Sequence, residues 1–160
     1  MKHKERFGIV KRVDCDVVVM PGAELSTDIC ITGNVYMANR SNSNGYDIDV
    51  GGSFFAEHAE FFNVCAGKKI QLTHSIGNDV WAEDEVVLKE PCALGDIYCN
   101  GDVSISPNSS VWDIHAMGTV DVQVKAHAQN VTSSKMILKN VKSNAEKLQS
   151  REIEYYLLVG

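Results

Sequence analysis

The chain repeats itself at near-constant intervals over most of its length, and this repeat limits the fold more than any other feature. An Asp or Asn followed by Ile or Val occurs seven times, at spacings of 19, 16, 16, 17, 17 and 17 residues. The pairs begin at Asp28, Asp47, Asn63, Asp79, Asp96, Asp113 and Asn130. A sustained period of this kind is the signature of an array in which each copy forms one structural unit.

Each repeat contains short alternations of apolar and polar residues. Counted from the Asp or Asn, the second, fourth, eighth and tenth positions are apolar or small, as in Ile97, Cys99, Val103 and Ile105. A third, looser pair follows them. Alternation with a period of two predicts strands that bury one face.

Three short strands in 16–17 residues leave no room for a helical crossover, which parallel strands otherwise need. Each repeat then forms one turn of a coil and buries its apolar face against neighbouring turns. We therefore expect an all-β chain, a parallel β-helix (a β-solenoid) of about seven 16–17-residue turns, over residues 16–142. The polar stretch from Ala38 to Gly45, in the longest interval, is expected to project from the rod.

The two ends differ from the repeats. Residues 1–15 form a basic segment, and an incomplete first turn is expected within residues 9–27. After Asn140 the pattern is lost, and the residues from Ser143 match the S-x-x-E capping box. This motif predicts a short helix over about 144–151, followed by a strand. Residues 143–160 are interpreted as a segment that caps the last turn, because an open solenoid end leaves a bare sheet edge.

The stretch from Gly101 to Val111, GDVSISPNSSV, resembles the repeat of bactofilins, and so do Gly95-Asp96-Ile97 and Gly33-Asn34-Val35. The likeness covers about residues 16–140. Bactofilins are polymer-forming bacterial cytoskeletal proteins. The resemblance implies a right-handed β-helix that assembles end to end through its terminal turns without nucleotide. The residues expected at these assembly ends are Val17, Val19, Met136, Leu138 and Val141.

Composition limits the classes of partner and the cellular compartment that we expect for this chain. The net charge of −6 does not favour nucleic acid, because phosphate binding needs a basic surface. The five cysteines show no CxxC spacing, which indicates a reducing compartment rather than a metal or disulfide framework. We expect a cytoplasmic protein. Its N-terminal segment, with Phe7, Ile9 and Val10 among basic residues, is either a candidate contact with an anionic membrane surface or a solvated terminus.

One column of the repeat is expected to present aromatic residues to solvent. The third position of three successive turns is Trp81, Tyr98 and His115. A row of exposed aromatics is typical of a partner surface, for carbohydrate, a cell-wall component or a protein. The alternative is a cross-strand ladder that only stiffens the sheet.

The sequence gives little support for a metal site, a cofactor site or a catalytic set. The column of Asp and Asn at position one is interpreted as turn-forming, with each side chain accepting backbone amides of its own turn, rather than as a calcium site. The histidines fall in different turns and at different positions, so no metal site is expected. We expect neither a cofactor nor a catalytic set.

Three functions remain open. The first is a structural, self-associating scaffold without catalytic activity, whose partners are further copies of itself and also a membrane surface or cell-wall-associated proteins. The second is a binding module that uses the aromatic row. The third is an acyltransferase of the hexapeptide type, which requires a left-handed coil and for which His115 is the only candidate catalytic residue.

Overall fold

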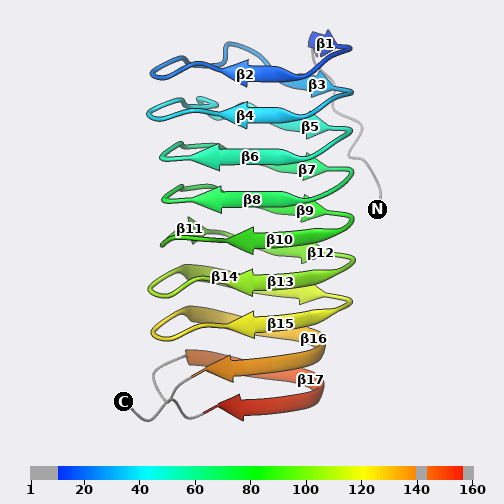
Figure 1. The fold of residues 1–160 in the computed structure, drawn as a ribbon, viewed down its shortest axis with the longest axis vertical. Helices are drawn as coiled ribbons and strands as arrows, with labels where there is room; N and C mark the ends of the chain where they lie inside the picture. Colours follow the sequence, from blue (N-terminus) through cyan, green and yellow to red (C-terminus); the bar gives the residue numbers. More distant parts are fainter. Residues whose placement is uncertain (1–10, 140–143, 157–160) are drawn as a thin grey trace.

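The computed structural model describes residues 11–139 and 144–156, and these residues form strands and turns without any helix (Figure 1). The strands stack as the rungs of a rod, where a rung is one turn of the coil. Neighbouring rungs pair in parallel, for example Ile97 with Val80 on one side and with Ile114 on the other. The predicted parallel β-solenoid of about seven turns is confirmed.

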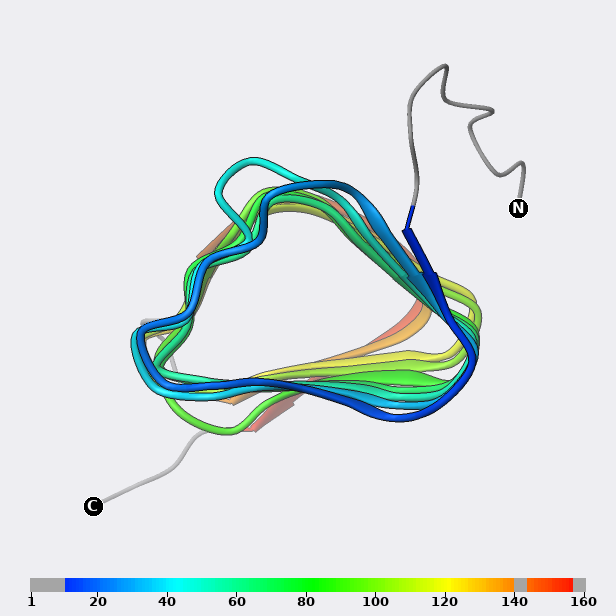
Figure 2. The ribbon, with the colours of Figure 1, turned by 90° about the horizontal axis from the view of Figure 1, so that it is seen from above.

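The coil has three faces, which Figure 2 shows as the sides of a rounded triangle. Face A contains β1 (Lys11–Val13), β3 (Ile29–Ile31), β5 (Ile48–Val50), β7 (Val64–Ala66), β9 (Val80–Ala82) and β12 (Ile97–Cys99). Face B contains β2 (Val17–Val19), β4 (Val35–Met37), β6 (Phe54–Glu57), β8 (Ile70–Thr73), β10 (Glu85–Leu88), β13 (Asp102–Ile105) and β15 (Thr119–Val122).

Face C is held mainly by single parallel bridges, through Glu24, Asn42, Glu60, Ile76 and Ala93. Its only short strand is β11 (Ala93–Leu94) among the described residues. Three longer strands bend around the corners: β14 (Ser110–Ala116) covers faces C and A, and β16 (His127–Lys139) and β17 (Asn144–Tyr156) cover all three faces.

The coil is right-handed. In Figure 1, β1 and β2 are at the top, the face B strands run to the left in front, and the face A strands run to the right behind. Seen from the N-terminal end, the chain therefore turns clockwise as it moves away from the viewer (Figure 2). This is the hand that the resemblance implies, and it does not fit the left-handed coil of a hexapeptide acyltransferase.

The inward positions of the rungs line up into columns that fill the interior. Phe54 and Ile70 are fully buried in one such column of face B, and Ile48 and Val64 are buried in a column of face A. One of the two inner columns of face C consists of small buried residues: Ser41, Ala59, Ser75, Cys92, Ser109 and Ala126. Regular stacking of like positions explains why the alternation in the sequence identified the core.

The position-one ladder, which is the column of Asp and Asn at the start of each repeat, links neighbouring rungs. Asp28 Oδ1 accepts a hydrogen bond from the backbone amide of Asp47, one rung further on, at 2.8 Å. Asp79 Oδ1 accepts one from the amide of Asp96 at 2.9 Å. The prediction that these side chains bind amides of their own turn was therefore wrong. A side chain at this corner lies against the following rung, because like positions stack directly.

Replacing Asp79 by Ala should lower the free energy of unfolding by about 1 kcal/mol, because the half-buried Asp96 amide loses its acceptor. Asp79→Asn should cost less, since an amide oxygen accepts the same bond, as Asn63 Oδ1 does from the Asp79 amide at 3.3 Å. Urea denaturation of the two variants measures the difference. Equal losses for Ala and Asn would show that the bond does not contribute.

The C-terminal segment differs from its prediction, because residues 144–151 belong to strand β17 and not to a helix. β17 pairs with β16 in the register of the repeat, with Ala145 opposite Ala128 and Leu148 opposite Val131. Pairing along the 13 residues of β17 satisfies the backbone hydrogen-bonding groups at the edge of β16. One capping box stabilises a helix less than this pairing stabilises the strand. The sequence did contain a signal for this strand, because Leu148 follows Val131 by the usual 17 residues of the repeat.

Only part of the stretch from Ala38 to Gly45 projects from the rod as predicted: a loop leaves the triangle (Figure 2), but Ser41 is buried and Asn42 bridges Glu24 and Glu60 within face C. Asn44 and Gly45 adopt left-handed backbone conformations, with φ of 54° and 78°. The Asn44 amide donates a hydrogen bond to Asn42 Oδ1 at 2.7 Å. Asn and Gly tolerate this conformation best, so the two extra residues leave the coil without disturbing its pairing.

Candidate functional site

The aromatic ladder, which is Trp81, Tyr98 and His115, forms as predicted on the outside of face A. The centroid of the Tyr98 ring lies 5.4 Å from that of Trp81 and 5.0 Å from that of His115. The plane of the Tyr98 ring is inclined by only 6° to that of Trp81 and by 11° to that of His115. Direct pairing of Tyr98 with both neighbours along the sheet places the three rings in one stack.

This geometry decides what the ladder offers to a ligand. Both faces of the Tyr98 ring are covered by its neighbours, so the ring presents its edge to solvent. A sugar-binding platform needs an aromatic face that is free to stack. Stacked cross-strand aromatics contribute about 0.5–1.5 kcal/mol per pair to stability. The geometry therefore favours the stiffening ladder over the carbohydrate platform.

Cys65 continues the same row and has an unusual thiol. It lies between Asp49 and Trp81 in the register of face A and is half-buried. Burial, together with the negative charges of Asp49 and Glu83, raises the pKa of the Cys65 thiol to about 11. The thiolate is the reactive form, so at pH 8 only about one Cys65 in a thousand is nucleophilic.

Iodoacetamide at pH 8 should therefore label the exposed Cys15 quickly and Cys65 very slowly. The labelling rate of Cys65 should rise about tenfold per pH unit toward its pKa. Trp81→Ala should accelerate it by uncovering the thiol. Mass spectrometry of the labelled peptides measures each rate, and labelling of Cys65 as fast as Cys15 at pH 8 would contradict the pKa shift.

A second aromatic row lies on face B. The rings of Tyr36 and Phe55 stack with centroids 4.9 Å apart and planes within 6°. Lys69 Nζ lies 5.5 Å from the centroid of the Phe55 ring, within reach of a cation–π contact. Val18 pairs with Tyr36 one rung nearer the N-terminal end, and its side chain is exposed. The row therefore reaches the first rung of the rod.

The prediction that the histidines occupy different positions was wrong for one pair. His58 and His74 stack at the corner between faces B and C, with ring centroids 4.7 Å apart. Both have positive φ, 48° and 44°, and they are 16 residues apart, which is one repeat. His74 Nε2 lies 3.8 Å from Glu90 Oε2. Within residues 11–139 and 144–156, no three His, Cys, Asp or Glu side chains converge on a metal site.

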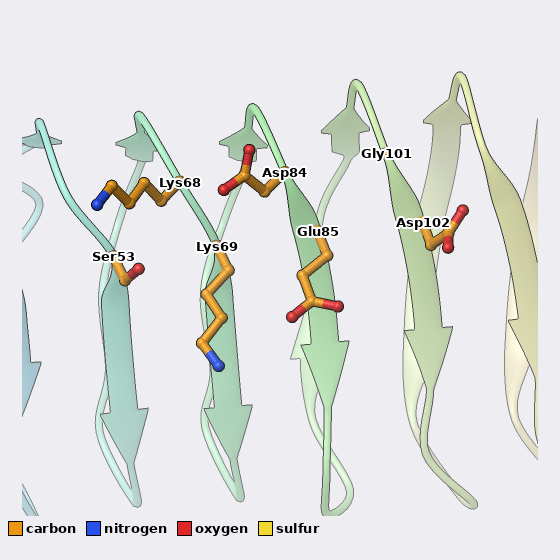
Figure 3. A pocket seen from close by; sticks show the side chains of 7 residues that line it. All are labelled: Ser53, Lys68, Lys69, Asp84, Glu85, Gly101 and Asp102. Atoms are coloured by element: carbon orange, nitrogen blue, oxygen red, sulfur yellow. The ribbon is translucent and has the colours of Figure 1, made fainter.

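A shallow groove of about 340 Å³ crosses four rungs at the corner between faces A and B (Figure 3). Two lysines lie on one rung and two carboxylates on the next, so the opposite charges are neighbours. The lining residues are Ser53, Lys68, Lys69, Asp84, Glu85, Gly101 and Asp102. A Cβ at Gly101 would overlap the carbonyl group of Asp84, so close packing of the rungs requires glycine there.

The residues predicted to form the assembly ends have different surroundings at the N-terminal and at the C-terminal end of the rod. Val17 and Val19 lie in β2, in the first described rung, where Val17 is half-buried. Met136 and Leu138 lie in β16, which is covered by β17 and is therefore not the last rung. Their assignment to an open end is corrected accordingly. Val141, Phe7, Ile9 and Val10 lie outside the residues that the structure describes.

An exposed apolar patch on face C was missed from the sequence. The side chains of Phe62, Ile76 and Trp112 are 40%, 57% and 65% exposed. Together with the exposed Ala93 they form what we call the face C patch. The sequence signal for this patch was weak, because these residues are outward positions of the third pair of apolar positions in each repeat, which is the least regular one.

Comparison with known proteins identifies no relative: no protein-family model, curated protein or solved structure matches this chain. Among the described residues, the structure also contains no helix with the length and hydrophobicity needed to cross a membrane.

Proposed function

We propose that this protein is a structural scaffold, a rigid rod that self-associates in the manner of bactofilins. The observation that carries the proposal is the N-terminal end of the coil. Apart from the buried Val19, its inward-facing apolar residues are only partly buried, whereas the corresponding residues of inner rungs are buried. These residues of the first rung are Val13, Val17, Ala23 and Leu25.

The backbone of the first rung supports the same proposal. In the described part of the chain, β1 pairs only with β3 and β2 pairs only with β4. Among the residues that the structure describes, each strand therefore leaves one row of backbone donors and acceptors without a strand partner. An edge of this kind is a template for another chain, and further apolar burial contributes about 25 cal/mol per Å².

Lys11 limits how tightly this end can be joined. It occupies the face A column that Ile29 and Ile48 fill in the next rungs, yet it is exposed. An inward-facing lysine on an edge strand opposes stacking, because its ammonium group must be desolvated. The proposed end contact is therefore reversible, and Lys11 sets its strength.

The experiment is negative-stain microscopy with sedimentation velocity on the whole chain and three variants. Val17→Asp should disrupt the end contact, and Lys11→Ile should strengthen it. Val18→Asp is the matched control, because Val18 is 57% exposed and faces sideways from the same strand. A strictly monomeric wild-type protein at high concentration would refute the proposal, and so would assembly that Val17→Asp leaves intact.

A further inference from the structure

The aromatic ladder ends at Trp81 with one face of the indole ring not covered by another ring. Tyr98 covers one face of Trp81, and the opposite face is turned toward Cys65, which pairs with Trp81 one rung nearer the N-terminal end. A cysteine side chain has a single heavy atom beyond Cβ, so it covers only the base of an indole ring. Asp49 pairs with Cys65 on the next rung. We call the space above Cys65, between Asp49 and Trp81, the face A slot.

The face A slot has room for one planar group. Asp49 and Trp81 are two rungs apart, about 10 Å. The Tyr98 ring lies 5.4 Å from Trp81 on the other side. A planar group at a similar distance on the free face lies above the rung of Cys65, midway between Trp81 and Asp49. The slot can therefore continue the ladder by one stacked group.

Negative charge surrounds the slot and selects a cation. Burial and the charges of Asp49 and Glu83 raise the pKa of the Cys65 thiol to about 11, so both carboxylates act on the space above it. The adjacent outward column of face A adds Asp47 and Asp79. A guanidinium group is planar and permanently charged, stacks on aromatic rings and pairs with carboxylates. It therefore fits this slot better than an uncharged sugar ring.

The N-terminal segment of the chain contains such a group at a matching distance. Residues 1–10 lie outside the described residues and contain two lysines, one arginine and one glutamate, so their charge is complementary to face A. The segment joins face A at Lys11, the first residue of β1. The slot lies three rungs from β1, about 14 Å. The five residues from Arg6 to Lys11 span up to about 17 Å.

We propose that the face A slot binds the guanidinium group of Arg6 from the same chain. The group stacks on the free face of Trp81 and lies between the carboxylates of Asp49 and Glu83. The basic segment is thereby held along face A. The contact lies on the side of the rod, so it leaves the end of the first rung open and does not depend on the proposed self-association.

The other cations of this region fit the slot less well. Lys4 has enough chain to reach it, but an ammonium group is a compact, strongly hydrated charge that cannot stack as a plane. Arg12 belongs to the same outward column as Cys65, three rungs away. Its Nε donates a hydrogen bond to Asp14 Oδ1 at 3.0 Å. Arg6 is the one arginine that precedes β1.

The test is acrylamide quenching of tryptophan fluorescence in the full chain with Trp112→Phe, where Trp81 is the one tryptophan. Arg6→Gln should increase the fraction of open slot about two- to fivefold, as expected for loss of an exposed cation–π contact, and quenching of Trp81 rises with it. Arg6→Lys should give an intermediate value. Lys2→Gln is the matched control, because it removes the same charge four residues further from β1. Circular dichroism confirms that each variant keeps the fold.

Two further measurements test the partners of Arg6. Asp49→Asn should also increase the quenching of Trp81, and adding Arg6→Gln to it should have little further effect, because both changes remove the same contact. Sodium chloride at about 1 M should increase the quenching when Arg6 is present, because charges are then screened within about 3 Å. The same salt should change the Arg6→Gln variant much less.

The outcomes are distinct from those of the assembly experiment. Unchanged quenching in Arg6→Gln, an equal effect of Lys2→Gln, or additive effects of Asp49→Asn and Arg6→Gln would overturn the proposal. Quenching that falls as the protein concentration rises would assign the slot to the N-terminal segment of a second copy and overturn the contact within one chain. A chain that sediments as a monomer throughout would overturn the proposed scaffold function and leave this contact intact.

Discussion

Replacement of Phe54 by alanine is expected to lower the free energy of unfolding by about 3–5 kcal/mol. Phe54 is the largest fully buried side chain of the described core. Its ring meets that of Phe61 edge to face, with centroids 5.3 Å apart and planes at 76°. The variant loses this contact and leaves a cavity that the rungs above and below cannot close, because their hydrogen bonds fix their spacing.

Urea denaturation of the purified variant measures this loss, at a concentration at which the protein is monomeric. Phe62→Ala is the matched control, because it removes the same side chain from a position that is 40% exposed. Its expected cost is below about 1 kcal/mol. Comparable losses for the two variants would mean that the interior near Phe54 is not tightly packed.

The second large effect is expected at Gly77. A Cβ placed there would overlap the ring of Phe61, which is itself buried. Gly77→Ala should therefore destabilise the fold by about 1–3 kcal/mol through overpacking. The two residues occupy the same inward column of face C on successive rungs, so the large ring and the missing side chain compensate each other.

A double-mutant cycle tests this pairing. Phe61→Leu alone removes an aromatic contact and should be destabilising. In that background, Gly77→Ala should cost clearly less than in the wild-type protein, because the smaller side chain leaves room for the methyl group. Additive losses in the urea denaturation series would show that Gly77 is required for another reason.

The architecture could be predicted because the repeat carries it redundantly. The residues at Ile97, Cys99, Val103 and Ile105 recur as apolar positions in the other repeats, so local errors did not change the period. The aromatic ladder followed from the same register, since Trp81, Tyr98 and His115 share one outward position. Much of what depends on stacking of like positions was within reach of the sequence, although the stacked pair His58 and His74 was not predicted.

The predictions that were wrong or missing concerned features that depend on contacts between rungs or on competing local signals. Asp79 looks like a local turn residue, and its bond to the next rung depends on how closely the rungs approach. The capping box at Ser143 predicted a helix because sheet pairing across 17 residues leaves no local mark. The face C patch was missed because Phe62, Ile76 and Trp112 differ in position and in chemistry.

The direction of the hydrogen bonds has a mechanical consequence. They join successive rungs and therefore run along the rod, so a pulling force on its two ends would open them one rung at a time. Each rung occupies about 4.8 Å of the rod. The 17 residues that it releases, as between Ile97 and Ile114, span about 58 Å when extended. A stretched rod would thus lengthen in steps of about 50 Å and act as an extensible tether whose length increases before it breaks.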